Sequence, residues 1–167
     1  HITVYLPAFS VEKLLQVLPR IRGLQWHVFS RNDYQLSGRD DIRIFAVDAK
    51  AFVTSMSSAS GVLCGAGFET PAEALHLGIP LMVVPMRGQY EQACNAAALE
   101  KIGAGVIWKT SDMRPEKIKE WAESRKAVKM EYPNVIEASL ERLMELYETE
   151  VKYGTGLLQG LRSLLAG

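Results

Sequence analysis

The stretch "GFETPAEALHLGIP", residues 67–80, reads as a helix with both ends marked. Thr70, Pro71 and Glu73 match a capping box, with Thr at the N-cap, Pro at the first helical position and Glu at the third. Gly78 then predicts where the helix ends. The first N–H groups of a helix also attract anions. The residues alone therefore leave two interpretations open: these side chains only cap the helix, or a ligand binds where the helix starts.

On both sides of this stretch, short apolar segments alternate with helical patterns. The predicted strands cover 2–6, 25–30, 42–47, 61–65, 81–85 and 105–108. The predicted helices between them cover 11–18, 49–59, 70–77 and 89–102, and Ser10 and Asp48 are the predicted caps of the first two. Such alternation is typical of a parallel sheet with helices on both faces. The sequence therefore predicts the α/β fold class.

The composition changes after Lys109, where polar amphipathic patterns replace the buried strands. The predicted C-terminal helices cover 115–128 and 134–150, and the apolar tail 155–165 is a further helix candidate. We expect a single domain over 1–167, with an α/β core over 1–109 and C-terminal helices over 110–167. Because the chain starts at His1 inside a strand-like segment, and not with Met, we expect it to be part of a longer protein.

The charge and cysteine content narrow the class of protein. The chain has 19 basic and 19 acidic residues, so its net charge is zero and gives no reason to expect nucleic acid or an anionic membrane as a partner. Cys64 and Cys94 have neither zinc-site spacing nor a CxxC motif, which favours reduced thiols in a cytoplasmic protein. No signal peptide or membrane-spanning run is visible.

The loop over residues 65–70 is the most informative one, because open α/β sheets bind ligands at the carboxyl ends of their strands. Gly65 and Gly67 have no Cβ, so their backbone lets a ligand approach closely. A phosphate at this loop would meet the first N–H groups of the next helix and the Thr70 hydroxyl. The alternative is that the glycines only turn the chain.

The loop after the next predicted strand starts a second helix with amides on one face. Gln89, Gln92 and Asn95 recur every three residues, and each amide both donates and accepts hydrogen bonds. They suit a ligand with many hydroxyls, although exposed amides are common on solvated helices. His76 and His27 are expected to be partly buried structural residues, and neither is given a catalytic role.

The segment "GAGFETPAEALHLGIPLMVVP…GQYEQACNAAALEKIGAG" resembles the donor-binding half of GT-B glycosyltransferases. The similar members use UDP-sugars, and they include the bacterial transferases that add GlcNAc to the peptidoglycan lipid precursor. The resemblance is strongest over residues 40–108, and it implies a Rossmann-like sheet that forms one half of a GT-B fold. Two features depart from relatives: "LPAFS" stands at 6–10 in place of a glycine-rich loop, and no basic residue lies near position 65.

The resemblance also implies roles for individual residues. Glu73 would bind the ribose hydroxyls, and Val47 would face the nucleobase through its backbone. The donor diphosphate would lie against Gly65, Ala66, Gly67, Phe68, Glu69 and Thr70. The donor sugar would lie near Gln89, Gln92 and Asn95. Donor binding in these enzymes needs no metal and no tightly bound cofactor.

The implied reaction transfers a hexosyl group from a nucleotide-sugar, expected to be a UDP-sugar, to an acceptor hydroxyl. The general base and the acceptor site would come from an N-terminal domain absent from this chain, so the fragment alone is expected to be inactive and its catalytic residues are unknown. Any contact with a membrane surface would come through that half. Three alternatives stay open: a nucleotide-sugar epimerase of the same fold, a separate subunit of a split transferase, and a non-catalytic sensor.

Overall fold

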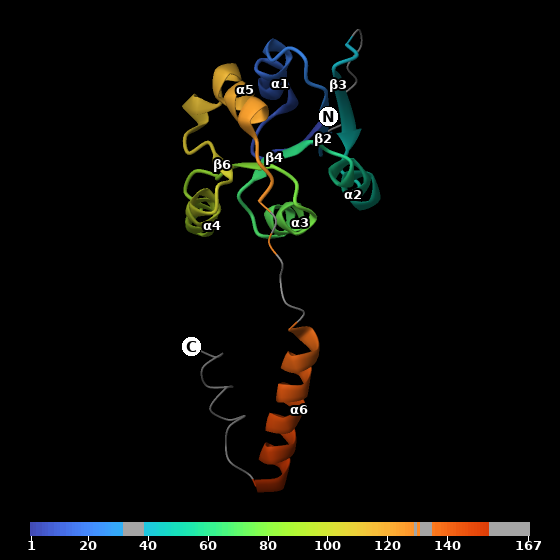
Figure 1. The fold of residues 1–167 in the computed structure, drawn as a ribbon, viewed down its shortest axis with the longest axis vertical. Helices are drawn as coiled ribbons and strands as arrows, with labels where there is room; N and C mark the ends of the chain where they lie inside the picture. The colour runs from blue at the N-terminus through green and yellow to red at the C-terminus, as the bar shows by residue number, and fades with distance from the viewer. Residues whose placement is uncertain (32–38, 129, 131–134, 154–167) are drawn as a thin grey trace. The chain divides into compact units, whose positions relative to one another are not determined.

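The computed structural model describes residues 1–31, 39–128, 130 and 135–153 (Figure 1). It divides into two compact units, His1–Glu131 and Tyr132–Gly167, and each is described here by itself. The first unit holds the sheet and the helices α1 to α5, so it extends past Lys109, where the composition of the sequence changes.

The first unit is built on a six-stranded sheet in which every neighbouring pair of strands is parallel. The strands are β1 (Ile2–Tyr5), β2 (Trp26–Ser30), β3 (Ile42–Ala46), β4 (Gly61–Gly65), β5 (Leu81–Val84) and β6 (Gly105–Val106). Their order is β3-β2-β1-β4-β5-β6, the order found in dinucleotide-binding folds. The predicted Rossmann-like α/β class is confirmed. The chain order reverses between β1 and β4, where such sheets bind their ligands.

Helices cover both faces of this sheet (Figure 1). They are α1 (Val11–Leu15), α2 (Ala49–Ser57), α3 (Glu69–Leu77), α4 (Tyr90–Lys101) and α5 (Pro115–Ser124), with short 3₁₀ turns at Leu18–Arg20 and Thr110–Asp112. Figure 1 shows α1 and α5 on one face and α3 and α4 on the other. The predicted caps of α1 and α2 are confirmed, because Ser10 accepts from the Lys13 N–H and Asp48 from the Ala51 N–H.

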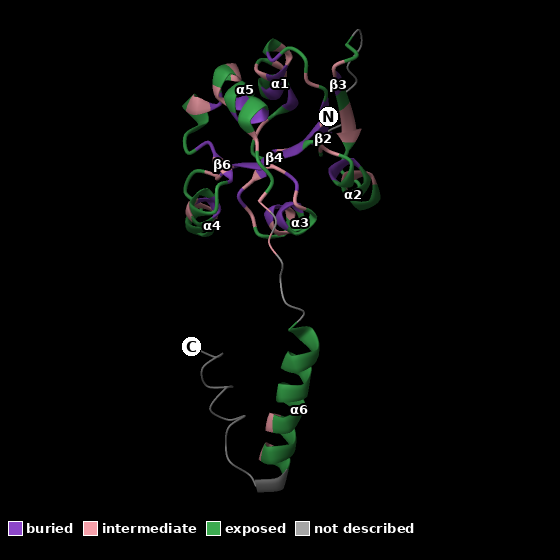
Figure 2. Ribbon diagram, viewed as in Figure 1, coloured by how far each residue is buried: buried purple, intermediate pink, exposed green. Residues whose placement is uncertain are grey.

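The core has two layers, one on each face of the sheet, because successive strand side chains point to opposite faces. Leu63 packs in the layer that includes Trp121 of α5, whereas Val62 and Cys64 pack in the layer that includes Leu75 of α3. In Figure 2 the central strands are buried between the helices. The strands are therefore packed from both faces of the sheet.

The second unit contributes one described helix, α6 (Ile136–Tyr153). Its apolar side chains Ile136, Leu140, Leu143 and Tyr147 are exposed. The predicted tail helix over 155–165 lies outside the described residues. Across the described part of the chain, no helix combines the length and the apolar character that spanning a membrane requires.

Candidate functional site

A pocket of about 360 Å³ lies at the carboxyl ends of β1 and β4, where the strand order reverses. We call it the switch-point pocket. Residues from the end of β1, the β4–α3 loop, the start of α3 and one turn of α4 meet there. They are Tyr5, Pro7, Cys64, Gly65, Gly67, Phe68, Glu69, Thr70, Pro71 and Gln92. The pocket therefore stands where the topology of an open α/β sheet favours a ligand.

Helix α3 starts earlier than the capping-box prediction. It begins at Glu69, its N-cap is Phe68, and no side chain makes a capping hydrogen bond there. The prediction that Thr70 is the N-cap was wrong. Pro71 did not fix the register, because several N–H groups of the first turn lack a helical partner and a proline costs nothing at any of those positions. Thr70 therefore lies inside the first turn, lines the pocket, and is not used as a cap.

The two glycines of the loop are not required by the protein's own packing. A Cβ at Gly65 or Gly67 would meet no heavy atom within 4 Å, and neither residue has a positive φ. Only a positive φ or a close neighbour obliges a chain to use glycine. Both glycines line the switch-point pocket, and the protein's own packing leaves room for a side chain at each of them.

Two amides of α4 hold the loops around the pocket. The Gln92 Oε1 accepts from the Met86 N–H at 2.9 Å, which fixes the loop after β5. The Asn95 Nδ2 donates to the Ala66 carbonyl at 3.1 Å, which fixes the loop after β4, and lies 3.5 Å from the Glu91 Oε1. Ala66 is itself fully buried. The amides that the sequence places on one face are therefore tied to two different loops.

The other predicted residues are distributed more widely. Glu73 is exposed on α3, one turn beyond Thr70 and on the same side of the helix. Gln89 is the N-cap residue of α4 and lines a different pocket, which is described below. Gln89 and Gln92 therefore do not line the same pocket, as the predicted sugar site would require. Val47 follows β3 and is 46% exposed, and its N–H donates to the Ser30 carbonyl at 3.2 Å. Only the Val47 carbonyl is thus left to meet a ligand through the backbone.

Sequence reasoning did not assign to the site four residues that line the switch-point pocket: Tyr5, Pro7, Cys64 and Pro71. The switch-point rule pointed to the loop after the first strand, but the apolar "LPAFS" gave no chemical signal there. Complete burial raises the pKa of the Cys64 thiol well above its usual range, so this thiol stays protonated and is a poor nucleophile.

The histidines take no part in the switch-point pocket. His76 is exposed on α3, so the expectation that it is partly buried was wrong. The His27 Nδ1 lies 3.0 Å from the Ser55 Oγ, and its ring stacks on His1 with 3.6 Å between centroids. Burial, with the nearby Arg43, lowers the His27 pKa. Among the described residues, no cluster of His, Cys, Asp or Glu is placed to hold a metal ion.

Comparisons with known proteins agree with this geometry. The family model described as "Glycosyl transferase family 1" matches residues 1–124. The chain is similar to the UDP-N-acetylglucosamine--N-acetylmuramyl-(pentapeptide) pyrophosphoryl-undecaprenol N-acetylglucosamine transferase of Brucella anthropi. The two are 36% identical over 67 aligned residues, and this alignment covers 39% of this chain and 18% of that protein. The chain is also 30% identical to a PGL/p-HBAD biosynthesis rhamnosyltransferase of Mycobacterium bovis over 89 aligned residues, which are 49% of this chain and 19% of that protein. The matches span less than a fifth of either relative.

Solved structures show the same fold. The glycosyltransferase SnogD from Streptomyces nogalater has a TM-score of 0.57 at 18% identity, over 74% of this chain and 34% of that chain. The spinosyn rhamnosyltransferase SpnG, in a complex with thymidine diphosphate, has a TM-score of 0.54 at 19% identity, over 74% and 36%. The chain therefore matches part of each of these larger proteins. The matched family and these relatives are transferases by name, so the comparisons give the epimerase alternative no support.

Proposed function

The chain belongs to glycosyl transferase family 1, and from this premise we propose that its sheet unit binds the nucleoside diphosphate of a sugar donor in the switch-point pocket. The observation that carries the proposal is the meeting of three features in one pocket. These are the topological switch point, two glycines that the packing does not require, and the start of α3 with an uncommitted Thr70.

The diphosphate is the part of the donor that these features suit best. The first N–H groups of α3 have no partner within the helix, and they carry the positive end of its dipole. Thr70 belongs to the same first turn and lines the same pocket, so its hydroxyl can donate a further hydrogen bond. Gly65 and Gly67 let phosphate oxygens come close to the backbone. Together these groups offset the charge of a diphosphate, so we propose that donor binding needs no metal.

The ribose, the nucleobase and the sugar of the donor are assigned to residues that follow different strands of the sheet. Glu73 lies one helical turn beyond Thr70, where its two carboxylate oxygens can accept from the ribose hydroxyls. Val47 follows β3, and its carbonyl can meet the nucleobase on that side. Gln92 lines the pocket from α4, on the side of β5, and suits the sugar. We propose that the donor is a UDP-sugar and that the transferred group is a hexosyl group.

The chemistry of transfer needs more than this site. The acceptor hydroxyl attacks the anomeric carbon, the bond to the diphosphate breaks, and the acceptor proton passes to a base. The switch-point pocket would stabilise the leaving diphosphate, which is the electrostatic part of catalysis. We propose that the base and most of the acceptor site come from a further domain of the whole protein, and that the reaction takes place in the cytoplasm.

The proposal is tested by the melting temperature of the 167-residue chain with UDP, dTDP, GDP and ADP at matched concentrations. A ligand at a hundred times its Kd stabilises the native state by about 2.7 kcal/mol, which raises the melting temperature of a chain this size by roughly 5–11 °C. We expect UDP to give the largest rise.

Gly67→Ala is the matched variant for this test. Gly67 lines the pocket and an added Cβ would meet nothing in the protein, so the unliganded melting temperature should not fall. The added methyl group should keep phosphate oxygens from the backbone, so the rise with UDP should be lost. If no nucleoside diphosphate raises the melting temperature, or if Gly67→Ala keeps the full rise, the switch-point pocket is not the donor site.

A further inference from the structure

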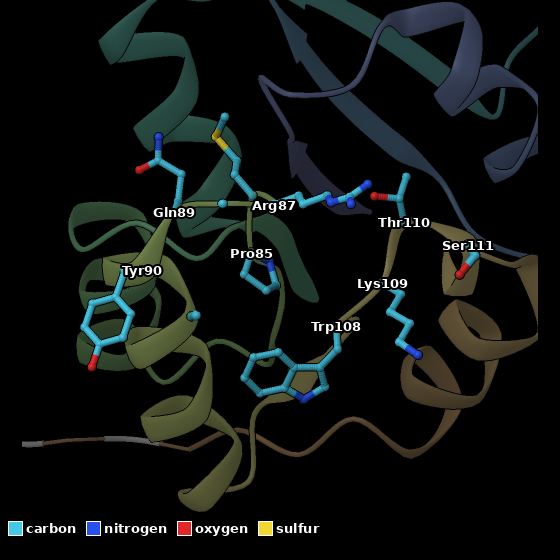
Figure 3. Close-up of a pocket in the computed structure, with 11 residues that line it drawn as sticks. Pro85, Arg87, Gln89, Tyr90, Trp108, Lys109, Thr110 and Ser111 are labelled. Carbon is cyan, nitrogen blue, oxygen red and sulfur yellow. The ribbon is translucent and has the colours of Figure 1, made fainter.

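A second pocket, of about 730 Å³, lies at the carboxyl ends of β5 and β6 (Figure 3). We call it the β5–β6 pocket. It is formed by the loop after β5, the first turns of α4, and the segment that follows β6. Its lining residues are Pro85, Met86, Arg87, Gly88, Gln89, Tyr90, Ala93, Trp108, Lys109, Thr110 and Ser111. The pocket opens at the same edge of the sheet as the switch-point pocket, because both lie where parallel strands end.

The charge of the β5–β6 pocket is one-sided. Arg87 and Lys109 both line it, and its lining set contains no acidic residue. Neither side chain forms an ion pair or hydrogen bond with another described residue, and Figure 3 shows the Arg87 side chain extended along the pocket toward Thr110. Two cations that line one pocket without an internal partner favour an anionic ligand.

Aromatic and hydroxyl groups complete the pocket. Trp108 is 41% exposed, and its orientation is fixed because Nε1 donates to the Glu100 Oε1 at 3.1 Å. Tyr90 is 85% exposed, and a hydrogen bond with Cys94 raises the pKa of its hydroxyl, so the side chain stays neutral and adds no negative charge. Exposed aromatic rings beside cations suit a ligand that joins an apolar ring to an anionic group.

We propose that the β5–β6 pocket binds an anionic group of the sugar acceptor, a phosphate or carboxylate carried next to an aromatic or alicyclic ring. This inference rests on the proposed function. The centre of this pocket lies two strand spacings, about 10 Å, from the β1–β4 switch point. Along the sheet, β3 lies on one side of the switch-point pocket and the β5–β6 pocket lies on the other side. A donor whose nucleobase lies near Val47, after β3, therefore has its sugar end directed toward the β5–β6 pocket. The acceptor must approach the anomeric carbon from that region.

The donor itself does not account for the two cations. Its negative charge is on the diphosphate, which belongs at the start of α3, and a hexosyl group is neutral. Of the two amides at the start of α4, Gln92 lines the switch-point pocket and Gln89 lines the β5–β6 pocket. The first turns of α4 thus form the boundary at which donor sugar and acceptor would meet.

The test follows the indole N–H signal of Trp108 by NMR in the 167-residue chain. The other two tryptophans, Trp26 and Trp121, are 0% and 9% exposed, so Trp108 is the indole that a ligand in this pocket can reach, and Trp108→Phe identifies its signal. The probe is phenyl phosphate, and benzyl alcohol is its uncharged counterpart. We expect phenyl phosphate to shift the Trp108 signal saturably, with an affinity that Arg87→Gln or Lys109→Gln lowers about fivefold.

The matched control is Lys101→Gln, which removes an exposed cation of α4 outside both pockets and should leave the affinity for phenyl phosphate unchanged. Saturating UDP should also leave the shift in place. The inference is overturned if phenyl phosphate gives no shift, if benzyl alcohol gives an equal one, or if UDP abolishes it, since the probe would then occupy the donor pocket. UDP shifts at Gly65 and Gly67, measured in the same samples, report separately on the proposed function.

Discussion

Helices α3 and α4 each follow a buried strand after a short loop, yet their polar side chains differ in the contacts they make. On α4, Gln92 and Asn95 make hydrogen bonds to the backbone of two loops. On α3, no side chain caps the helix start, and Thr70 and Glu73 make no hydrogen bond or ion pair within the described residues. The comparison indicates that side chains of α4 support the loops around the pocket, whereas Thr70 and Glu73 of α3 are not used for this purpose.

The difference has a physical basis. A buried carbonyl such as that of Ala66 needs a hydrogen-bond partner, and the Asn95 amide supplies it. An exposed carboxylate such as Glu73 is hydrogen-bonded to water, so the folded protein is not destabilised when this side chain has no protein partner. Variants of the two helices should therefore separate into those that change stability and those that change binding.

The largest effect is expected for Asn95→Ala. This change leaves the fully buried Ala66 with no partner for its carbonyl, at a cost of about 1–3 kcal/mol. Thermal unfolding should show a melting temperature lower by roughly 2–12 °C. UDP affinity, measured by calorimetry, should fall as well because the loop over 65–67 loses its support. An unchanged melting temperature would show that the hydrogen bond from Asn95 of α4 does not stabilise the loop after β4.

Glu73→Gln should weaken UDP binding by about tenfold or more, because a charge-assisted hydrogen bond contributes roughly 1.5–3 kcal/mol. Its melting temperature should stay the same, since Glu73 is exposed and has no cap role. The control is Glu116→Gln, an exposed first-turn glutamate of α5 outside the pocket. Equal UDP affinity in the two variants would remove the ribose role of Glu73.

Thr70→Val should weaken UDP binding by about fivefold through loss of one hydrogen bond. Stability should not change, because Phe68 and not Thr70 is the N-cap of α3. Asp48→Ala is the contrasting variant: this side chain accepts from the Ala51 N–H at 2.8 Å, and its loss should cost about 1 kcal/mol. If denaturant unfolding gives both variants the same loss of stability, Thr70 caps α3 after all.

The smallest effects separate the two glutamines of α4. Gln92→Ala frees the Met86 N–H and should cost about 1 kcal/mol of stability. Gln89→Ala removes an exposed side chain that makes no capping hydrogen bond, so its stability should lie within about 0.5 kcal/mol of the wild type. Urea unfolding measures both, and a larger loss for Gln89→Ala would reverse the assignment of these two amides.

The sequence predicted the strands well because buried parallel strands are short apolar runs, and it predicted the caps of α1 and α2 because Ser10 and Asp48 act locally. It misplaced the start of α3 because proline and acidic residues are tolerated throughout a first turn. The partners of Gln92 and Asn95 could not be predicted, since they depend on how loops far apart in the chain meet. Tyr5 and Pro7 line the pocket because β1 pairs with β4, and this pairing of distant segments leaves no signal in the local sequence.

The central claim is that UDP binds in the switch-point pocket, and NMR mapping of the backbone amides tests it most directly. Titration of the 167-residue chain with UDP should give its largest shifts at Gly65, Gly67 and Thr70, while the indole signal of Trp108 in the β5–β6 pocket stays in place. Shifts confined to other loops, such as the one around Gly88, or no shifts at saturating UDP, would contradict the account.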